Sequence, residues 1–204
     1  MSSDSSQEPP SPYAGGSLAP RQVASAASLY ALMALLSILW GWQQGRPNLL
    51  HHPTPAFTLS DSVGIAASLL AAITLTGITI LGNAWFARFT KWGARLQREF
   101  RHLIGPLARS HVSLLAITSA VGEELLFRGA MQPVLGLWLT SALFGVLHGG
   151  LSRRLWPWAV WAGAMGLVLG AMYEALGTLI APLLAHASIN YASMRKLQST
   201  YTRR

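Results

Sequence analysis

Long apolar segments are the feature that most restricts how this chain of 204 residues can fold. Residues 23–42 and 63–86 are each about as long as a helix needs to cross a bilayer, roughly 20 residues. Turn-forming and charged residues divide the later apolar sequence into four more segments, at residues 111–132, 137–151, 158–176 and 178–192. We therefore predict an all-α membrane protein, a polytopic bundle of about six transmembrane helices.

The first apolar segment has a second interpretation, as a cleavable signal peptide. The residues before it, 1–20, are rich in Ser and Pro and contain no Lys or Arg. A signal peptide starts with a basic region, so we favour a transmembrane helix at residues 23–42. Because residues 1–20 cannot bury enough apolar surface to offset the entropy of ordering them, we predict a disordered tail there.

The composition excludes several classes of protein. Only 11% of the residues are charged and 51% are apolar, whereas about 25% of residues are charged in ordinary soluble domains. A conventional soluble enzyme is therefore excluded, and no nucleic-acid partner is expected despite the net charge of +8. The absence of cysteine excludes disulfide frameworks, cysteine nucleophiles and thiolate zinc sites.

Residues 88–109 form an amphipathic pattern at helical spacing. The apolar face consists of Phe89, Trp92, Leu96, Phe100, Leu103 and Leu107, and the basic face of Arg88, Lys91, Arg95, Arg98 and Arg101. A helix of this kind lies in the membrane interface against anionic headgroups, so we expect membrane lipids as partners. A helix that packs against another part of the protein is the alternative interpretation.

The basic residues predict the orientation of the bundle. If the amino terminus lies inside the cell, every Lys and Arg except Arg46 and Arg128 falls on the inner side. By the positive-inside rule, both termini are then cytoplasmic. The small size favours a bacterial source, and hence an integral protein of the inner (plasma) membrane. The predicted parts are a disordered tail (1–20), two transmembrane helices with the amphipathic helix (21–110), a core of four membrane helices (111–194) and a basic cytoplasmic tail (195–204).

Two adjacent acidic residues, Glu123 and Glu124, lie inside the third apolar segment. Ionisable groups in a membrane helix are costly, so they usually face the bundle interior and mark a functional site. Glu124 and Arg128 are four residues apart, with the acidic residue first, and this spacing favours an ion pair on one helix face. Glu123 points about 100° away around the helix, so its partner must come from another helix.

Candidate partners for Glu123 lie on the later segments. Phe144 and His148 share one helix face, and so do His186 and Asn190. An α-helix rises 1.5 Å per residue. Counted along the helix from the predicted turn on the outer side of the membrane, Glu123, His148 and His186 therefore each lie at a depth of roughly 16 Å. We therefore predict one polar cluster, built by three helices near the middle of the bilayer.

These motifs resemble those of the CPBP family of intramembrane proteases, the group of CAAX proteases and bacteriocin-processing proteins. The family pattern is EExxxR, then FxxxH, then HxxxN. The matching residues, in order, are Glu123 and Glu124 with Arg128, Phe144 with His148, and His186 with Asn190. The resemblance covers residues 119–191 and identifies residues 111–194 as a catalytic core similar to that of the family.

The resemblance implies a hydrolase, a glutamate-dependent intramembrane endopeptidase that cleaves membrane-associated protein or peptide substrates. Glu123 is then the general base that activates water, and His148 helps to hold that water. His186 and Asn190 form the pair that stabilises the oxyanion. The supporting residues implied are Glu124, Arg128 and Phe144, of which Phe144 shapes the wall of the site.

Other interpretations of the same residues stay open. Glu123, Glu124, His148 and His186 carry ligand atoms that suit zinc, but the sequence has no HExxH motif and Arg128 disfavours a cation beside Glu124. We therefore expect no cofactor. Buried Glu and His residues can also relay protons in a proton-coupled membrane transporter. The third possibility is a non-catalytic membrane regulator of the same fold.

Overall fold

The structure, a computed structural model, describes residues 20–150 and 153–199. Within these ranges the chain forms helices, of which α1 and α2 are joined by the long connection at residues 44–60, and no β-strand is present beyond one isolated bridge between His51 and Thr178. The prediction of an all-α membrane protein is confirmed. The helices are α1 (Pro20–Gln43), α2 (Asp61–Phe89), α3 (Lys91–Ile104), α4 (Arg109–Glu123), the π-helix η1 (Glu124–Met131), α5 (Gln132–Gly145), the π-helix η2 (Val146–Gly150), α6 (Trp156–Leu176) and α7 (Ile180–Gln198).

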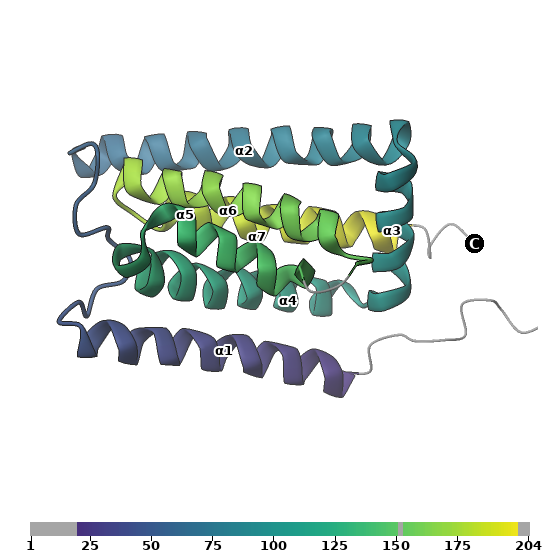
Figure 1. Cartoon of the computed structure of the whole chain (residues 1–204), viewed down its shortest axis with the longest axis horizontal. Helices are drawn as coiled ribbons and strands as arrows, with labels where there is room; N and C mark the ends of the chain where they lie inside the picture. The colour runs from purple at the N-terminus through teal and green to yellow at the C-terminus, as the bar shows by residue number, and fades with distance from the viewer. Residues whose placement is uncertain (1–19, 151–152, 200–204) are drawn as a thin grey trace, which may run out of the picture.

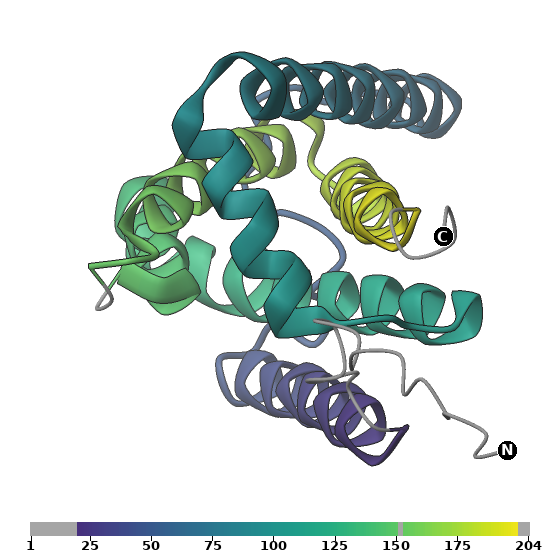
Figure 2. The ribbon, with the colours of Figure 1, turned by 90° about the vertical axis from the view of Figure 1, so that its right-hand side faces the viewer.

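Most of the helices run along the long axis of the molecule. Figure 1 shows α1, α2, α4, α5, α6 and α7 along this axis, with α3 across one end. Figure 2, which views the bundle from that end, shows α3 crossing in front of the other helices. The six predicted apolar segments therefore correspond to six passes along the bundle.

The reversal between the third and fourth passes occurs at Gly136. The helical path runs through α4 and η1 into the first residues of α5, and is interrupted at Gly136, where φ is 77° and ψ is 166°. Positive φ is a conformation that Gly adopts at low cost. The sequence predicts this turn at residues 133–136, and the structure assigns the reversal to the last residue of that range.

Four helical stretches are long and apolar enough to cross a membrane: Pro20–Gln43, Asp61–Phe89, Arg109–Gly149 and Trp156–Leu176. The third stretch contains the reversal at Gly136 and therefore makes two passes. The sixth predicted segment, 178–192, forms most of α7 but is not among these stretches. Helix α7 contains polar residues and ends with the basic residues Arg195 and Lys196, and these lower its hydropathy.

The outward faces of the long helices carry large apolar side chains. Examples are Ile73 (70% exposed), Leu81 (72%) and Trp138 (75%). An apolar surface of this extent suits a lipid environment, because soluble monomers rarely expose large contiguous apolar patches.

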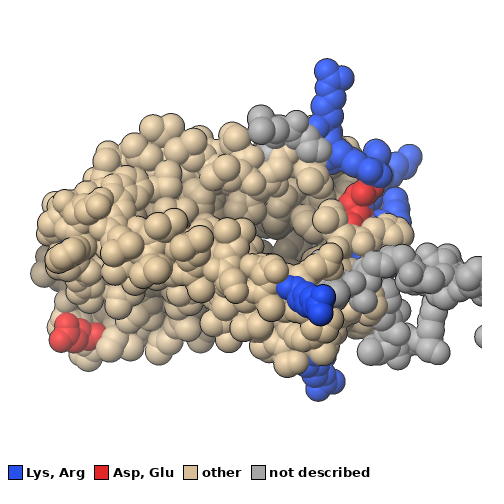
Figure 3. Space-filling view, turned by 90° about the horizontal axis from the view of Figure 1, so that it is seen from below, with Lys and Arg blue, Asp and Glu red and all other residues tan. Residues whose placement is uncertain are grey.

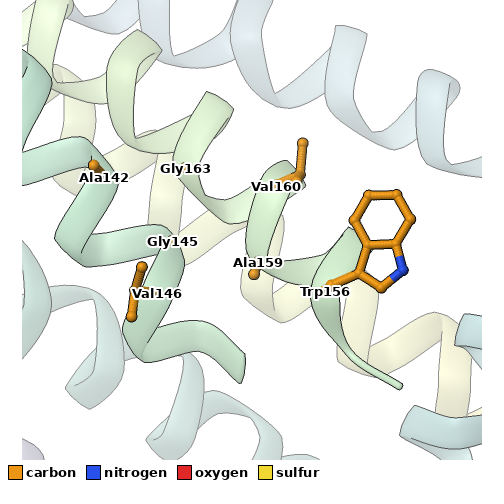
Figure 4. A pocket seen from close by; sticks show the side chains of 7 residues that line it. All are labelled: Ala142, Gly145, Val146, Trp156, Ala159, Val160 and Gly163. Carbon is orange, nitrogen blue, oxygen red and sulfur yellow. The ribbon is translucent and has the colours of Figure 1, made fainter. Parts of the chain in front are cut away.

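Helices α5 and α6 approach each other at small residues. A Cβ atom built on Gly145 would lie 2.7 Å from the Ala159 carbonyl oxygen and 3.1 Å from the Gly163 Cα. Small residues allow such close approach in membrane helix pairs. A shallow apolar groove of about 330 Å³ lies over this contact, between Val146 on one side and Trp156 and Val160 on the other (Figure 4).

The predicted amphipathic helix is shorter than residues 88–109. Arg88 belongs to α2, and α3 begins after Thr90, whose Oγ1 accepts a hydrogen bond from the Gly93 backbone N at 2.9 Å. Helix α3 ends at Gly105, whose φ is 62°. An N-cap Thr and a glycine at the other end account for both boundaries.

Part of the apolar face of α3 packs against the start of α6. Trp92 contacts Trp156 and Phe100 contacts Trp158, with ring centroids 5.2 Å and 4.9 Å apart. Leu103 on the same helix is 61% exposed. Helix α3 therefore combines the two interpretations of its sequence, since it both packs on the bundle and keeps apolar residues at the surface.

The basic residues gather at the end of the bundle that carries α3. Figure 3 shows Lys and Arg side chains near this end, with one acidic group among them and another acidic group at the opposite end. Asp61 lies in the first turn of α2. The predicted tail at residues 1–20 lies outside the described residues except for Pro20, which begins α1. Of the predicted basic tail at 195–204, residues 195–198 form the end of α7 and residues 200–204 lie outside the described part.

Candidate active site

Glu123 and Glu124 lie where helix α4 passes into the π-helix η1. Glu123 is 6% exposed and Glu124 is fully buried. A π-helical turn changes the direction in which successive side chains point, and such turns occur frequently at functional sites. Two adjacent carboxylates are costly to bury, so they need hydrogen-bond donors or positive charges from nearby residues.

Glu124 forms a buried ion pair with Arg128. Arg128 Nη1 lies 3.1 Å from Glu124 Oε1, and Arg128 Nη2 donates to the Gly166 carbonyl of α6 at 3.3 Å. The guanidinium also lies over the Phe144 ring, 4.5 Å from its centroid. Arg128 therefore joins η1 to both α5 and α6 while it neutralises Glu124.

Glu123 faces two histidines that come from other helices. Its Oε2 atom lies 3.5 Å from His148 Nε2, in η2, and 3.7 Å from His186 Nε2, in α7. Oε2 makes no hydrogen bond with any residue in the described part of the chain. Both distances are longer than a normal hydrogen bond, so the two imidazoles are close neighbours of Glu123 without a direct hydrogen bond to Oε2.

The other nitrogen of each histidine is bonded, and this fixes the orientation of the ring. His148 Nδ1 lies 2.7 Å from the Phe144 carbonyl oxygen, and His186 Nδ1 lies 2.7 Å from Glu124 Oε1. A carbonyl or carboxylate oxygen can only accept, so Nδ1 carries the proton in both rings. The Nε2 atoms that face Glu123 are then acceptors whenever the rings are neutral.

Phe144 packs against several members of this cluster. Its ring centroid lies 4.2 Å from that of His148 and 6.2 Å from that of His186. It also makes an edge-on contact with Phe127, at 4.9 Å. Phe144 is 3% exposed and forms an apolar wall beside both histidines.

Asn190 lies at the edge of the cluster. Its Nδ2 atom donates to Ser119 Oγ at 3.0 Å, and Ser119 precedes Glu123 by one turn of α4. Within the described residues, its side-chain hydrogen bond therefore goes to α4 and not to Glu123 or to either histidine. The structure brings together Glu123, Glu124, Arg128, Phe144, His148 and His186, with Asn190 one helical turn further along α7.

Three further residues lie near the candidate site, and no pattern in the sequence predicts their position there. The Tyr30 backbone, on α1, lies against Gly122, the residue before Glu123, where an added Cβ atom would lie 2.6 Å from the Tyr30 carbonyl oxygen. Ser119 accepts the bond from Asn190, and Trp158 lies beside His148 with 6.2 Å between ring centroids. None of them belongs to a charged pair or a spaced motif, so only the packing of the helices identifies them.

Among the described residues, no group of three or more His, Asp or Glu side chains is arranged to hold a metal ion. Glu124 Oε1 is bonded to both Arg128 and His186, so its proton donors occupy the position that a cation would need.

Comparison with known proteins bears on the carboxy-terminal half of the chain. Residues 106–192 match the family described as type II CAAX prenyl endopeptidase Rce1-like. YpbD of Bacillus subtilis (strain 168), an uncharacterized protein, is 34% identical over 94 residues, which are 46% of this chain and 49% of YpbD. The chain thus spans about half the length of the curated relative that it matches. No solved structure matches the chain.

The apolar helices and the matched family define an integral membrane protein with a buried glutamate and histidine cluster. Residues 106–192 match the Rce1-like family, and the resemblance to the CPBP proteases is confirmed on this segment. The segment contains every residue of the three motifs, whereas α1, α2 and α3 lie outside it.

Proposed function

We propose that this protein is an intramembrane endopeptidase in which Glu123 activates a water molecule to hydrolyse a peptide bond. The observation that supports this most directly is the convergence of Glu123 Oε2 with His148 Nε2 and His186 Nε2, at 3.5 Å and 3.7 Å. Hydrolysis needs a base, a held water and donors for the oxyanion, and this arrangement offers candidates for each.

His148 and Glu123 are suited to hold the attacking water. With its Nδ1 proton donated to Phe144, neutral His148 presents a lone pair at Nε2. Ionised Glu123 also presents lone pairs, and two acceptors 3.5 Å apart need a shared donor. One water at about 2.8 Å from each atom supplies both hydrogen bonds. Glu123 then takes a proton from this water as its oxygen attacks the carbonyl carbon.

His186 is suited to stabilise the oxyanion. The buried charges of Glu123, Glu124 and Arg128 sum to one negative charge, which a proton on His186 would balance. His186 would then donate from Nε2 into the site while Nδ1 stays bonded to Glu124. Asn190 keeps one amide hydrogen beyond the one that it donates to Ser119, and this hydrogen is available as a second donor.

Completion of the reaction returns the proton to the leaving group. The tetrahedral intermediate collapses with cleavage of the C–N bond, and the proton held by Glu123 moves to the leaving nitrogen. Glu124 and Arg128 keep His186 oriented, and Phe144 walls the site. No metal is used in this scheme.

The substrate that we propose is a membrane-associated protein or peptide. Helix α4 continues directly into η1, and Glu123 lies at the junction of the two. The cluster therefore lies within the length of this membrane pass and not at its end. The scissile bond must therefore enter the bundle at membrane depth. We also propose that the basic end of the bundle faces the cytoplasm of a bacterial inner membrane, with α3 against anionic lipids.

A comparison of peptide termini in cell membranes tests the proposal. Membranes from cells that carry the native chain, Glu123→Gln or Glu174→Gln are compared at equal expression. Glu174 is the matched control, because it is also a helical glutamate but bonds to Gln132 at 3.0 Å. We expect a set of new termini with the native chain and with Glu174→Gln that is absent with Glu123→Gln. Identical termini in all three membranes would contradict the proposal.

A further inference from the structure

A basic hollow lies between α3 and the start of α6, at the end of the bundle where the basic residues gather. Arg95 of α3 lines it together with Arg153 and Arg154, which directly precede α6. The hollow has a volume of about 80 Å³, several times the roughly 10–15 Å³ that one water molecule needs. It therefore has room for a group larger than a single water, such as a phosphate.

The hollow carries an excess of positive charge. Glu99 is the only acidic residue in the described lining, and it pairs with Arg154 at 2.9 Å. Arg95 and Arg153 are exposed and add positive charge that no acidic residue of this lining balances. A guanidinium presents paired N–H groups that match the oxygens of a phosphate. The complementary ligand is therefore an anionic phosphate group.

The apolar groove between α5 and α6 begins beside this hollow. Trp156, the first residue of α6, lines both the hollow and the groove. Figure 4 shows the groove from Trp156 past Val160 to Gly163, which is about 10 Å along a helix that rises 1.5 Å per residue. The lining of the groove consists of Gly, Ala, Val and Trp and carries no charge. The hollow and the groove together match a molecule with a charged head and an apolar tail.

The two parts lie at the levels where a membrane holds such a molecule. Trp92 and Trp156 contact each other at the hollow and are 43% and 51% exposed. Trp side chains favour the boundary between headgroups and acyl chains. The hollow then lies at the level of the headgroups, and the groove follows α6 to the level of the acyl chains. Basic pockets between membrane helices bind anionic headgroups in this way.

We propose that this site binds one anionic glycerophospholipid, with its phosphate at Arg95 and Arg153 and an acyl chain in the groove. The proposal is independent of the proposed function. It goes beyond contact of α3 with an anionic membrane surface, because it assigns a single lipid to a site that needs both α3 and α6. Val146 lines the groove and begins η2, so the lipid lies against the element that carries His148.

Native mass spectrometry of the purified full chain tests the basic hollow. The probes are phosphatidylglycerol and phosphatidylcholine with the same acyl chains, because only the first has a net negative charge. We expect one phosphatidylglycerol to bind with a Kd at least about tenfold lower than that of phosphatidylcholine. Replacement of both Arg95 and Arg153 by Gln should remove this preference, since each basic residue near a headgroup adds to the attraction.

The matched control replaces Arg88 and Arg98 by Gln. Both are exposed arginines at the same end of the bundle, and both lie outside the lining of the hollow. This variant should keep the native preference for phosphatidylglycerol. Equal loss of preference in the two double variants, or no preference in the native chain, would overturn the proposal.

Ala142→Phe tests the groove. Ala142 is an exposed residue of the groove lining, so the larger side chain takes the space of the acyl chain. We expect the Kd of phosphatidylglycerol to rise about tenfold, because the lipid loses buried apolar area. Ala66→Phe, at an exposed position of α2, should keep the native Kd. All variants are compared at an unchanged thermal unfolding midpoint.

A soluble headgroup distinguishes a lipid from a free phosphate compound. Glycerol phosphate has the anionic phosphate and no acyl chain, so it should not displace phosphatidylglycerol from the native chain. Displacement by glycerol phosphate, or a native Kd in Ala142→Phe, would show that the hollow binds a phosphate group alone. Either result would overturn the lipid site.

Discussion

Glu123 and Glu124 are neighbours in the sequence but bond to different groups. Glu124 is held by Arg128 at 3.1 Å and by His186 at 2.7 Å, so its Oε1 atom is fully engaged. Glu123 faces the Nε2 atoms of both histidines. One carboxylate thus orients a histidine, and the other is left with an oxygen that can act on a bound molecule. His186 contacts both, which couples the two carboxylates.

Asn190 provides a prediction at the level of single residues. If its free amide hydrogen stabilises the oxyanion, Asn190→Ala should lower the rate about 100- to 1,000-fold. Ser119→Ala removes only the acceptor of the other hydrogen, so its rate should fall less than about tenfold, the cost of one ordinary hydrogen bond. The measurement is the rate at which Glu123-dependent termini form, with the folded fraction of each variant as the control. Equal losses in the two variants would show that Asn190 only ties α7 to α4.

The sequence predicts part of this chemistry and misses the rest for physical reasons. The Glu124–Arg128 pair follows from a spacing of four residues on one helix, and the structure contains it. The dual contact of His186 depends on the rotation of α7 about its axis, which a single helix cannot reveal. Tyr30 lies 93 positions before Glu123, and no periodicity connects the two.

The elements of the fold bring these side chains to one level. Gly136 reverses the chain after α4 and η1, so that α5 and then η2 return along the bundle and bring His148 to Glu123. His148 is followed by Gly149, whose φ of 115° interrupts the helical path of η2 directly after the histidine. The turn at Gly136 is predictable from Pro133 and Gly136. The π-helical turns at η1 and η2 are not, because the local sequence is equally compatible with an α-helix.

The close contact of α5 and α6 provides a prediction at the level of elements. In Gly145→Ala, the new Cβ atom would lie 2.7 Å from the Ala159 carbonyl, so the two helices must separate. We expect a loss of about 1–3 kcal/mol in the free energy of unfolding, as is typical of overpacking. Gly77→Ala on α2 is the control, because nothing lies within 4 Å of its added Cβ atom. Denaturation of both variants in detergent measures the difference, and equal stability of the two would contradict close packing at Gly145.

The whole molecule has a polar asymmetry along its long axis. Basic residues gather at the end that carries α3 (Figure 3), and the outer faces of the long helices carry large exposed apolar side chains. At the opposite end, the connection between α1 and α2 is held to the turn between α6 and α7, for example by the bond from Leu179 N to the Leu50 carbonyl at 2.9 Å. The sequence predicts this asymmetry well, because it depends on composition and not on side-chain packing.

Topology is the prediction at the level of the whole molecule. The positive-inside rule predicts that the end that carries α3 is cytoplasmic. Alkaline phosphatase fused after Arg204 should therefore be inactive in a bacterial host. The same enzyme fused after Pro55, at the opposite end of α1, should be active because it reaches the periplasm. The reverse pattern of activity would overturn the orientation while leaving the fold intact.

The most direct test of the central claim is hydrolysis in water enriched in oxygen-18. Membranes with the native chain or with Glu174→Gln should produce new carboxyl termini that carry the heavy oxygen, with or without a metal chelator. Membranes with Glu123→Gln should produce none of these labelled termini. Labelled termini that persist in Glu123→Gln, or that disappear from the native sample on chelation, would contradict a metal-independent protease that uses Glu123 to activate water.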